Sequence, residues 1–246
     1  MLGDRAAAEV LWWSGWAATR AAAGRRPAAL PPSGPAAAVH LTTVVRLPAA
    51  VTAALAPVVE RLRALEPGHH WYPPESLHVT VQNLDGLAPA ATGPLPGRPG
   101  GRQPGAVGDG AAPVREVVAA HQPFRLAVRG LGVAPASVFA LALPGDVTLR
   151  SLRHGLARLP AGGTRRRWVG RGLGHANLVR FSGPVTGVFL AEVARLRRQD
   201  FGSFIVDEVE MVRTDRYLSP AGTTTLERLR LAGRRSRGWG PGRGRA

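Results

Sequence analysis

The sequence contains no cysteine and no lysine, and it lacks any long run of apolar residues. The absence of cysteine excludes a disulfide framework and thiol chemistry, which is compatible with the cytoplasmic location that we expect. No apolar stretch approaches the roughly 20 residues that a membrane-spanning helix requires, so we expect a soluble protein without a membrane partner. The 246 residues suffice for a full hydrophobic core, in one domain or in two closely packed lobes.

The charge of the chain is strongly unbalanced. Its 32 basic residues outnumber 16 acidic ones and give a formal net charge of +16, and every one of these basic residues is arginine. A chain rich in alanine, arginine, glycine and proline but without lysine is typical of a GC-rich genome, so part of this excess carries no functional message. The remainder favours a polyanionic partner, because arginine can bind phosphate through two parallel hydrogen bonds.

The two ends of the chain have the composition of segments outside a fold. Residues 1–37 are rich in alanine, arginine and proline without clean periodicity, which predicts a disordered or non-conserved extension. A secretory signal is the competing interpretation, but Glu9 interrupts the apolar stretch and no convincing cleavage site follows. Residues 232–246 carry arginines among glycines and are predicted to form a basic disordered tail. The folded domain is expected at residues 38–231.

Within this domain, the pattern predicts strands that alternate with helices. Apolar stripes at helical spacing predict helices at 50–66, 149–159 and 185–198, and β-prone runs predict strands at 40–47, 76–84, 124–132, 138–143, 174–181, 204–213 and 223–231. Glycine or proline occupies 12 of the 23 positions from 91 to 113. This density predicts a disordered insertion at 87–113 that cannot hold a helix, followed by a short helix at 114–120.

Two of the β-prone runs each place a histidine two residues before a small hydrogen-bonding side chain. His78 precedes Thr80, and His175 precedes Asn177. Successive side chains of a strand point to opposite faces, so both members of each pair share one face while apolar residues cover the other. We therefore expect two strands that each bury one face in a core and turn the other toward a cleft.

Two such histidines favour acid–base chemistry, although a single histidine on a strand is more often a structural residue. One imidazole can take a proton from an attacking oxygen while the other donates a proton to a leaving oxygen. The separation of 97 positions is far too long for local metal-ligand spacing, and no nearby cysteine or second histidine completes a zinc pattern. We therefore predict chemistry without a metal or another cofactor, in which Thr80 and Asn177 donate hydrogen bonds to a phosphoryl group.

The segment Tyr72–Thr80, with the sequence YPPESLHVT, resembles the first signature of the two-histidine phosphoesterases. This superfamily includes the bacterial 2′-5′ RNA ligases and the RNA 2′,3′-cyclic phosphodiesterases, and its hallmark is a His-x-Thr/Ser motif in each half of a duplicated fold. The resemblance covers roughly residues 39–230. Asn177 departs from the pattern, because it stands where the family usually has threonine or serine.

The resemblance implies an α+β fold of two pseudo-symmetric lobes. Each lobe would be an antiparallel sheet with helices on its outer face, and the active-site cleft would lie between the lobes, with His78 and His175 as the catalytic residues. The implied reaction is metal-independent hydrolysis of the 2′,3′-cyclic phosphate of RNA or a nucleotide to a 2′-phosphate, with 2′-5′ RNA ligation as its reverse. Two alternatives are a catalytically weakened RNA- or nucleotide-binding protein and an enzyme of the same fold that acts on small cyclic nucleotides. We expect a monomer.

Two further residues are candidates for substrate binding. Tyr72 could stack on a base, although an aromatic residue just before a strand more often belongs to a core. Arg171 follows the run Arg165–Arg167 and precedes His175, where it could attract a phosphodiester, although arginine runs are more often solvated loops. Arg180 has the opposite parity to His175, so on an unbroken strand it is expected to face away from the cleft.

Overall fold

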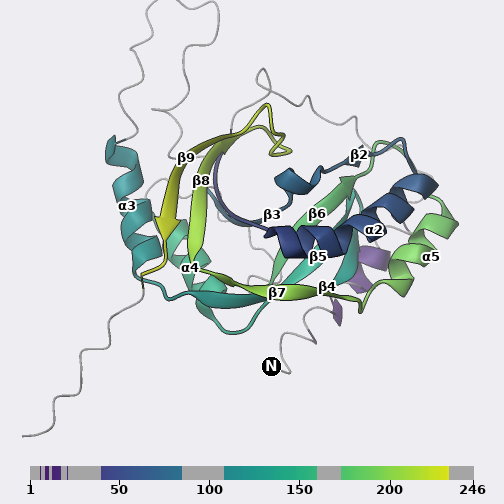
Figure 1. Ribbon diagram of the computed structural model, residues 1–246, viewed down its shortest axis with the longest axis horizontal. Helices are drawn as coiled ribbons and strands as arrows, with labels where there is room; N and C mark the ends of the chain where they lie inside the picture. Colours follow the sequence, from purple (N-terminus) through teal and green to yellow (C-terminus); the bar gives the residue numbers. More distant parts are fainter. Residues whose placement is uncertain are drawn as a thin grey trace, which may run out of the picture.

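The computed structural model of the protein describes residues 6, 9–10, 13–17, 21, 40–84, 108–159 and 173–232. These residues form two antiparallel β-sheets with helices packed around them (Figure 1). The α+β class and the two-sheet architecture predicted from the sequence are confirmed. No helix in these ranges combines the length and the apolar character needed to span a membrane.

Each sheet contains one of the two histidine-bearing strands. The first sheet has the strand order β3-β1-β8-β9 and the second has the order β2-β6-β5-β4-β7. The first consists of β1 (His40–Arg46), β3 (His78–Asn83), β8 (Glu208–Thr214) and β9 (Thr224–Arg230). The second consists of β2 (His70–Trp71), β4 (Phe124–Ala134), β5 (Ser137–Pro144), β6 (Gly174–Arg180) and β7 (Asp200–Val206). His78 therefore lies on β3, at one edge of the first sheet, and His175 lies on β6 of the second.

The helices bury apolar stripes against these sheets. The chain forms α2 (Ala49–Leu65), the short 3₁₀ helix η1 (Pro74–Ser76), α3 (Gly108–Ala119), α4 (Thr148–Ala157) and α5 (Gly187–Arg195). Helix α2 packs against β7 and α5, and α4 packs against β3 and α3. Helix α4 follows β5 of the second sheet but packs against β3 of the first. The helix therefore connects the two sheets.

The predicted strand at 204–213 is wrong, because this stretch forms parts of two strands in different sheets. Strand β7 ends at Val206 and pairs with β4, whereas β8 begins at Glu208 and pairs with β1 and β9. The exposed Asp207 lies between the two strands. The β-prone pattern continues across this position, and a local pattern does not reveal which partner a strand pairs with.

The prediction that residues 87–113 cannot hold a helix is wrong for its last six residues, since α3 begins at Gly108. Ala111, Val114 and Val118 follow one another at helical spacing and are at most 2% exposed. Helix α3 packs against α4 and β9, and this burial offsets the cost of Pro113 inside the helix. Tertiary packing therefore overrides the local composition here. Residues 85–107 lie outside the described ranges.

Part of the N-terminal extension contacts the second sheet, so the prediction that all of residues 1–37 lie outside the fold is wrong. Residues 13–17 are helical, and Trp16 packs against the hydrophobic core. A Cβ atom on Gly15 would overlap the carbonyl oxygen of Val133, so only glycine permits this approach to β4. The guanidinium of Arg197 lies over the ring of Trp13, 5.9 Å from its centroid. The tail beyond residue 232 lies outside the described residues.

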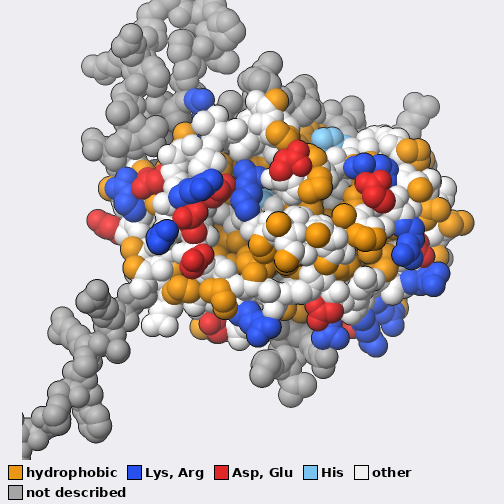
Figure 2. All heavy atoms as spheres, in the orientation of Figure 1, with side chains coloured by type: hydrophobic (Ala, Val, Ile, Leu, Met, Phe, Trp, Pro, Cys, Tyr) orange, Lys and Arg blue, Asp and Glu red, His pale blue; other side chains and the backbone are white. Residues whose placement is uncertain are grey.

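Arginine side chains gather over α2 and α5, at the right of the face in Figure 2. Several of them pair with glutamates of the same two helices. The ion pairs are Arg61–Glu192 at 3.0 Å, Arg63–Glu60 at 3.2 Å and Arg195–Glu192 at 3.4 Å. Exposed pairs of this kind stabilise a protein by only about 0.2–1 kcal/mol each. Their main consequence is that neighbouring carboxylates neutralise part of the positive charge over these helices.

Candidate active site

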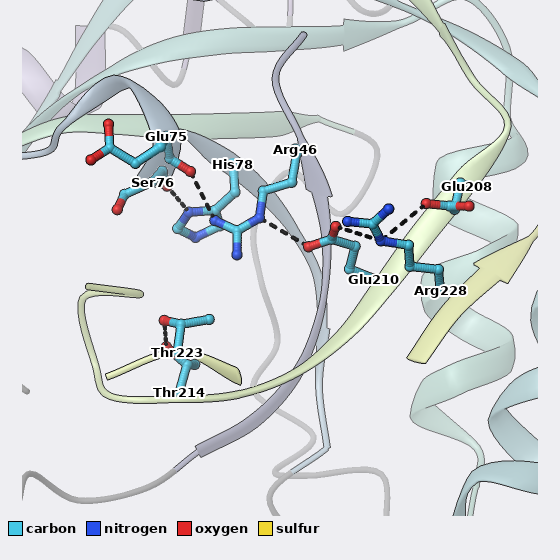
Figure 3. A network of polar contacts seen from close by, with 9 residues as sticks. All are labelled: Arg46, Glu75, Ser76, His78, Glu208, Glu210, Thr214, Thr223 and Arg228. Carbon is cyan, nitrogen blue, oxygen red and sulfur yellow. Dashed lines mark hydrogen bonds and ion pairs between the residues drawn. The ribbon is translucent and has the colours of Figure 1, made fainter. Parts of the chain in front are cut away.

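The first histidine is buried and held by the backbone just before its strand. His78 is 7% exposed, and its Nδ1 atom lies 2.7 Å from the carbonyl oxygen of Ser76 in η1 (Figure 3). A carbonyl oxygen can only accept, so the ring donates from Nδ1, and the lone pair of the neutral ring lies on Nε2. The turn Pro74–Ser76 therefore fixes the tautomer and presents Nε2 for proton transfer.

The expected shared face of His78 and Thr80 is confirmed by the strand register. Arg46, Val45 and Val44 of β1 pair in order with His78, Val79 and Thr80, so no irregularity separates the two motif residues. Val79, between them, is fully buried, whereas Thr80 is partly exposed. A β-bulge follows at Val81.

The second motif has the same alternation. His175 and Asn177 are partly exposed, while Ala176 and Leu178 are fully buried. Phe139 of the neighbouring strand β5 contacts His175, with ring centroids 5.2 Å apart. The second pair of motif residues therefore also shares the face that the sequence predicts.

The prediction that Arg180 faces away from this site is wrong, because β6 contains a β-bulge. Val138 of β5 pairs with Val179 while Phe139 pairs with Asn177, which leaves Leu178 as the extra residue. Leu178 and Val179 are consequently both buried, and Arg180 returns to the face of Asn177. No pattern in the sequence marks this bulge.

Arg180 is close enough to both histidines to influence their titration. Its charge lowers the pKa of His78 and also that of His175. Its Nε atom donates a hydrogen bond of 2.9 Å to the hydroxyl of Tyr72. Arg180 is therefore a cation held beside two imidazoles that belong to different sheets.

Tyr72 contributes to the site through this hydroxyl. The residue is 3% exposed and belongs to the hydrophobic core, so its ring offers no open face to a base. Burial raises the pKa of the Tyr72 phenol, which keeps it protonated at neutral pH. His70 packs edge-on to Tyr72 and also against Tyr217, with centroid separations of 5.2 and 4.6 Å. Arg171 lies outside the described residues.

A second cation lies beside His78, and no motif in the sequence indicates it. Arg46, at the end of β1, donates from Nε to Glu210 at 3.0 Å and from Nη1 to the carbonyl oxygen of Glu75 at 3.2 Å. Figure 3 shows its guanidinium next to the His78 ring, and its charge lowers the pKa of His78. Glu210 also pairs with Arg228 at 3.4 Å. The position of Arg46 is therefore fixed from two sides.

The surroundings of both histidines favour the neutral ring. Burial lowers the pKa of His78 to about 4, an effect that the Ser76 carbonyl opposes and that Arg46 and Arg180 reinforce. Burial also lowers the pKa of His175 to about 4, and Arg153, His78 and Arg180 reinforce that change. The influence of His78 on His175 shows that the two rings interact across the boundary between the sheets. Among the described residues, no group of three histidine, aspartate or glutamate side chains is arranged to hold a metal ion.

These pKa values predict that the free energy of unfolding falls in mild acid. The folded-state pKa values of about 4 lie below the ordinary histidine value of about 6.5, so the unfolded chain binds protons first between these two pH values. This contribution to stability is complete above about pH 6.5 and is lost as the pH falls toward 4. Denaturant unfolding at pH 7 and pH 5 measures it, and the loss should shrink when both histidines are replaced with glutamine. An equal loss in that double variant would contradict the assignment.

The chain matches no protein-family model and no curated protein. It does match solved structures. The structure of TT0787 from Thermus thermophilus is 26% identical, with 79% of this chain and 99% of that chain covered, at a TM-score of 0.55. A structure described as a phosphoesterase is 17% identical, with 78% and 97% of the two chains covered, at a TM-score of 0.50. E. coli LigT complexed with 3′-AMP is 16% identical, with 82% and 99% covered, at a TM-score of 0.47.

Proposed function

We propose that this chain, whose fold is that of the two-histidine phosphoesterases, opens the 2′,3′-cyclic phosphate of RNA or of a nucleotide to a 2′-phosphate. The main support is that His78 helps to lower the pKa of His175, although the two lie on different sheets, and that Arg180 lowers the pKa of both. Two imidazoles beside a shared guanidinium suit a phosphodiester, which needs a base, an acid and a donor to its charged oxygens. A metal ion is not needed for any of these roles.

The reaction adds one water molecule across a P–O bond. One histidine takes a proton from water as its oxygen attacks phosphorus, and the other gives a proton to the 3′-oxygen as the P–O3′ bond breaks. The Ser76 carbonyl favours the protonated form of His78, whereas Arg153 disfavours the protonated form of His175. We therefore assign His78 as the general acid and His175 as the general base. Microscopic reversibility allows the same groups to join RNA ends through a 2′-5′ linkage.

The bound phosphate supplies the charge that the acid requires. An anion beside His78 favours the imidazolium and raises the low pKa of the ligand-free ring. Arg180 and the side chains of Thr80 and Asn177 would donate to the non-bridging oxygens, where negative charge develops in the transition state. The observed face-sharing of each histidine with its motif partner supports this arrangement.

Phosphorus NMR of a 2′,3′-cyclic nucleotide tests the proposal. We expect the cyclic phosphate signal to be replaced by that of the 2′-phosphate, at the same rate with a chelator present. An RNA oligonucleotide with a 2′,3′-cyclic end, used in parallel, separates an RNA substrate from a mononucleotide. A 3′-phosphate product, or no product, would contradict the proposed reaction.

The alternative is a binding protein of the same fold, which the low pKa of both histidines favours because little imidazolium forms near neutral pH. That alternative predicts that the protein binds the RNA end in a filter or fluorescence assay and leaves the cyclic phosphate intact after long incubation.

Replacing Asn177 with threonine is expected to raise kcat by up to about tenfold. Threonine replaces the longer amide donor with the hydroxyl donor that the family resemblance implies at this position of β6, and it retains the strand geometry. Initial rates on the cyclic nucleotide measure the effect, and Asn177→Ala is the matched control that should be slower than the native protein. A threonine variant as slow as the alanine variant would show that the amide itself is required.

A further inference from the structure

We propose that Arg153 is a positioning residue that fixes the separation of the two histidine-bearing strands, an inference that rests on the proposed function. Arg153 lies on α4, among the leucines that pack this helix, and is partly buried. No sequence pattern separates it from the many other arginines of the chain. Its importance follows from what its guanidinium contacts.

The guanidinium uses all three of its nitrogen atoms on backbone carbonyls near the two motifs. Nε donates to Val81 at 3.0 Å and Nη2 donates to Thr80 at 2.7 Å. Nη1 donates to Leu173 at 2.6 Å. Thr80 and Val81 belong to β3, whereas Leu173 immediately precedes β6. One planar group therefore joins the two sheets beside their histidines.

The shape of β3 explains why a fork-shaped donor fits there. Strand β3 is at the edge of its sheet, with β1 as its hydrogen-bonded neighbour. At the bulge, the register with β1 shifts so that Val81 is the extra residue. The carbonyls of Thr80 and Val81 both accept from Arg153, an arrangement in which two adjacent donors meet two adjacent acceptors. A lysine ammonium has a single nitrogen atom and cannot span the same three carbonyls.

A close contact beside this fork shows how tightly the strands approach. A Cβ atom on Gly174 would lie 2.7 Å from Cγ1 of Val79 and 3.1 Å from Cβ of Ala142. Glycine at 174, next to His175, thus allows close contact with Val79, next to His78. Arg153 and Gly174 therefore both affect the distance between β3 and β6. Arg153 holds the strands together through hydrogen bonds, and Gly174 has no side chain that would push them apart.

The charge of Arg153 also reaches the second histidine, whose pKa it helps to lower. Burial lowers the pKa of Arg153 itself to about 10, so it stays a cation at neutral pH. The effect of the charge and the effect of the hydrogen bonds can therefore be separated by experiment, because a lysine retains the charge but cannot form the three hydrogen bonds of the guanidinium.

The first test compares Arg153→Lys and Arg153→Gln, with Arg150→Gln on the exposed side of the same helix as control. We expect both Arg153 variants to lose about 10- to 100-fold in kcat with KM changed by less than about threefold, because a misplacement near 1 Å is costly for proton transfer. The apparent pKa of the base in the pH profile of kcat should rise only in Arg153→Gln, because only this variant removes the charge that lowers the pKa of His175. A lysine variant with native kcat would overturn the proposal, since charge alone would then suffice.

A second variant tests the spacing without touching Arg153. Gly174→Ala should reproduce the loss in kcat, whereas Gly183→Ala, where a Cβ meets nothing within 4 Å, should be neutral. A native rate for Gly174→Ala would overturn the idea that this spacing limits turnover, even if the Arg153 variants fail to fold.

A distance measurement separates this inference from the proposed reaction. Because the chain contains no cysteine, spin labels can be placed at Thr225→Cys in the first sheet and Ile205→Cys in the second without removing native thiols. Pulsed EPR should show a broader or shifted distance distribution after Arg153→Lys or Arg153→Gln. An unchanged distribution would overturn the positioning role, whereas a changed one would support it even if no cyclic phosphate is hydrolysed.

Discussion

Replacing His78 or His175 with alanine is expected to lower kcat on a 2′,3′-cyclic nucleotide by about 10²- to 10⁴-fold, the range that a positioned general acid or base contributes. The size of the effect follows from the separate roles proposed for the two histidines as general acid and general base. In the proposed reaction, the departing 3′-oxygen lacks a proton donor without His78, and the attacking water lacks a base without His175. KM should change little, because Arg180, the proposed phosphate-binding cation, is retained in both variants. Initial-rate kinetics at pH 7 measure both parameters.

The two histidines should also be non-additive. A double alanine variant is expected to be no slower than about the slower single variant, since an acid and a base that act in one step are lost together. His154→Ala, at an exposed position of α4, is the matched control and should retain the native rate. Two single variants with native kcat would show that the reaction, if present, does not use these rings.

The second large effect is expected from Arg180→Met, which should lower kcat/KM by about 10²- to 10³-fold, as the loss of one donor to a developing oxyanion does. Removing this cation also removes a charge that lowers the pKa of both histidines. The pH at which each ring titrates should therefore rise, which histidine-selective NMR can follow.

A comparison with Arg180→Lys separates charge from geometry at this position. Lysine retains the positive charge but is not expected to reproduce the Nε hydrogen bond to Tyr72, so we expect an intermediate rate and nearly native histidine pKa values. Arg213→Gln, at an exposed position of β8, serves as control for the change in net charge. An Arg180→Met variant with unchanged histidine titration would contradict its placement beside both rings.

The parts of the site that follow from strand alternation were predictable. His78 with Thr80, and His175 with Asn177, share the faces that their spacing predicts, because neither pair is interrupted by a bulge. Strand alternation alone places Arg180 on the wrong face, because the extra residue Leu178 reverses the parity and has no signature in the hydrophobic pattern.

Other features depended on contacts that are distant in sequence. Arg153 donates to the carbonyls of residues 80, 81 and 173, and backbone acceptors carry no sequence signal. Helix α3 tolerates Pro113 because the fold buries its apolar side. Strands β7 and β8 are separate because their pairing partners lie in different sheets. The apolar stripes of the helices and the alternation of the strands are local properties of the sequence, whereas these features arise only once the chain has folded.

The route of the chain through the two sheets has a consequence for synthesis on the ribosome. Strand β1 pairs with β8, so His40 lies opposite Thr214 and the sheet that carries His78 contains residues from both ends of the described domain. A nascent chain that has not yet emerged as far as residue 208 has β1 and β3 but lacks the two strands that complete their sheet. Such long-range pairing delays folding and leaves a strand edge open to other chains in the meantime. All strands of the second sheet precede residue 208, so we infer that only the sheet that carries His78 must wait for the last strands, and that chaperone demand should be highest just before those strands are made.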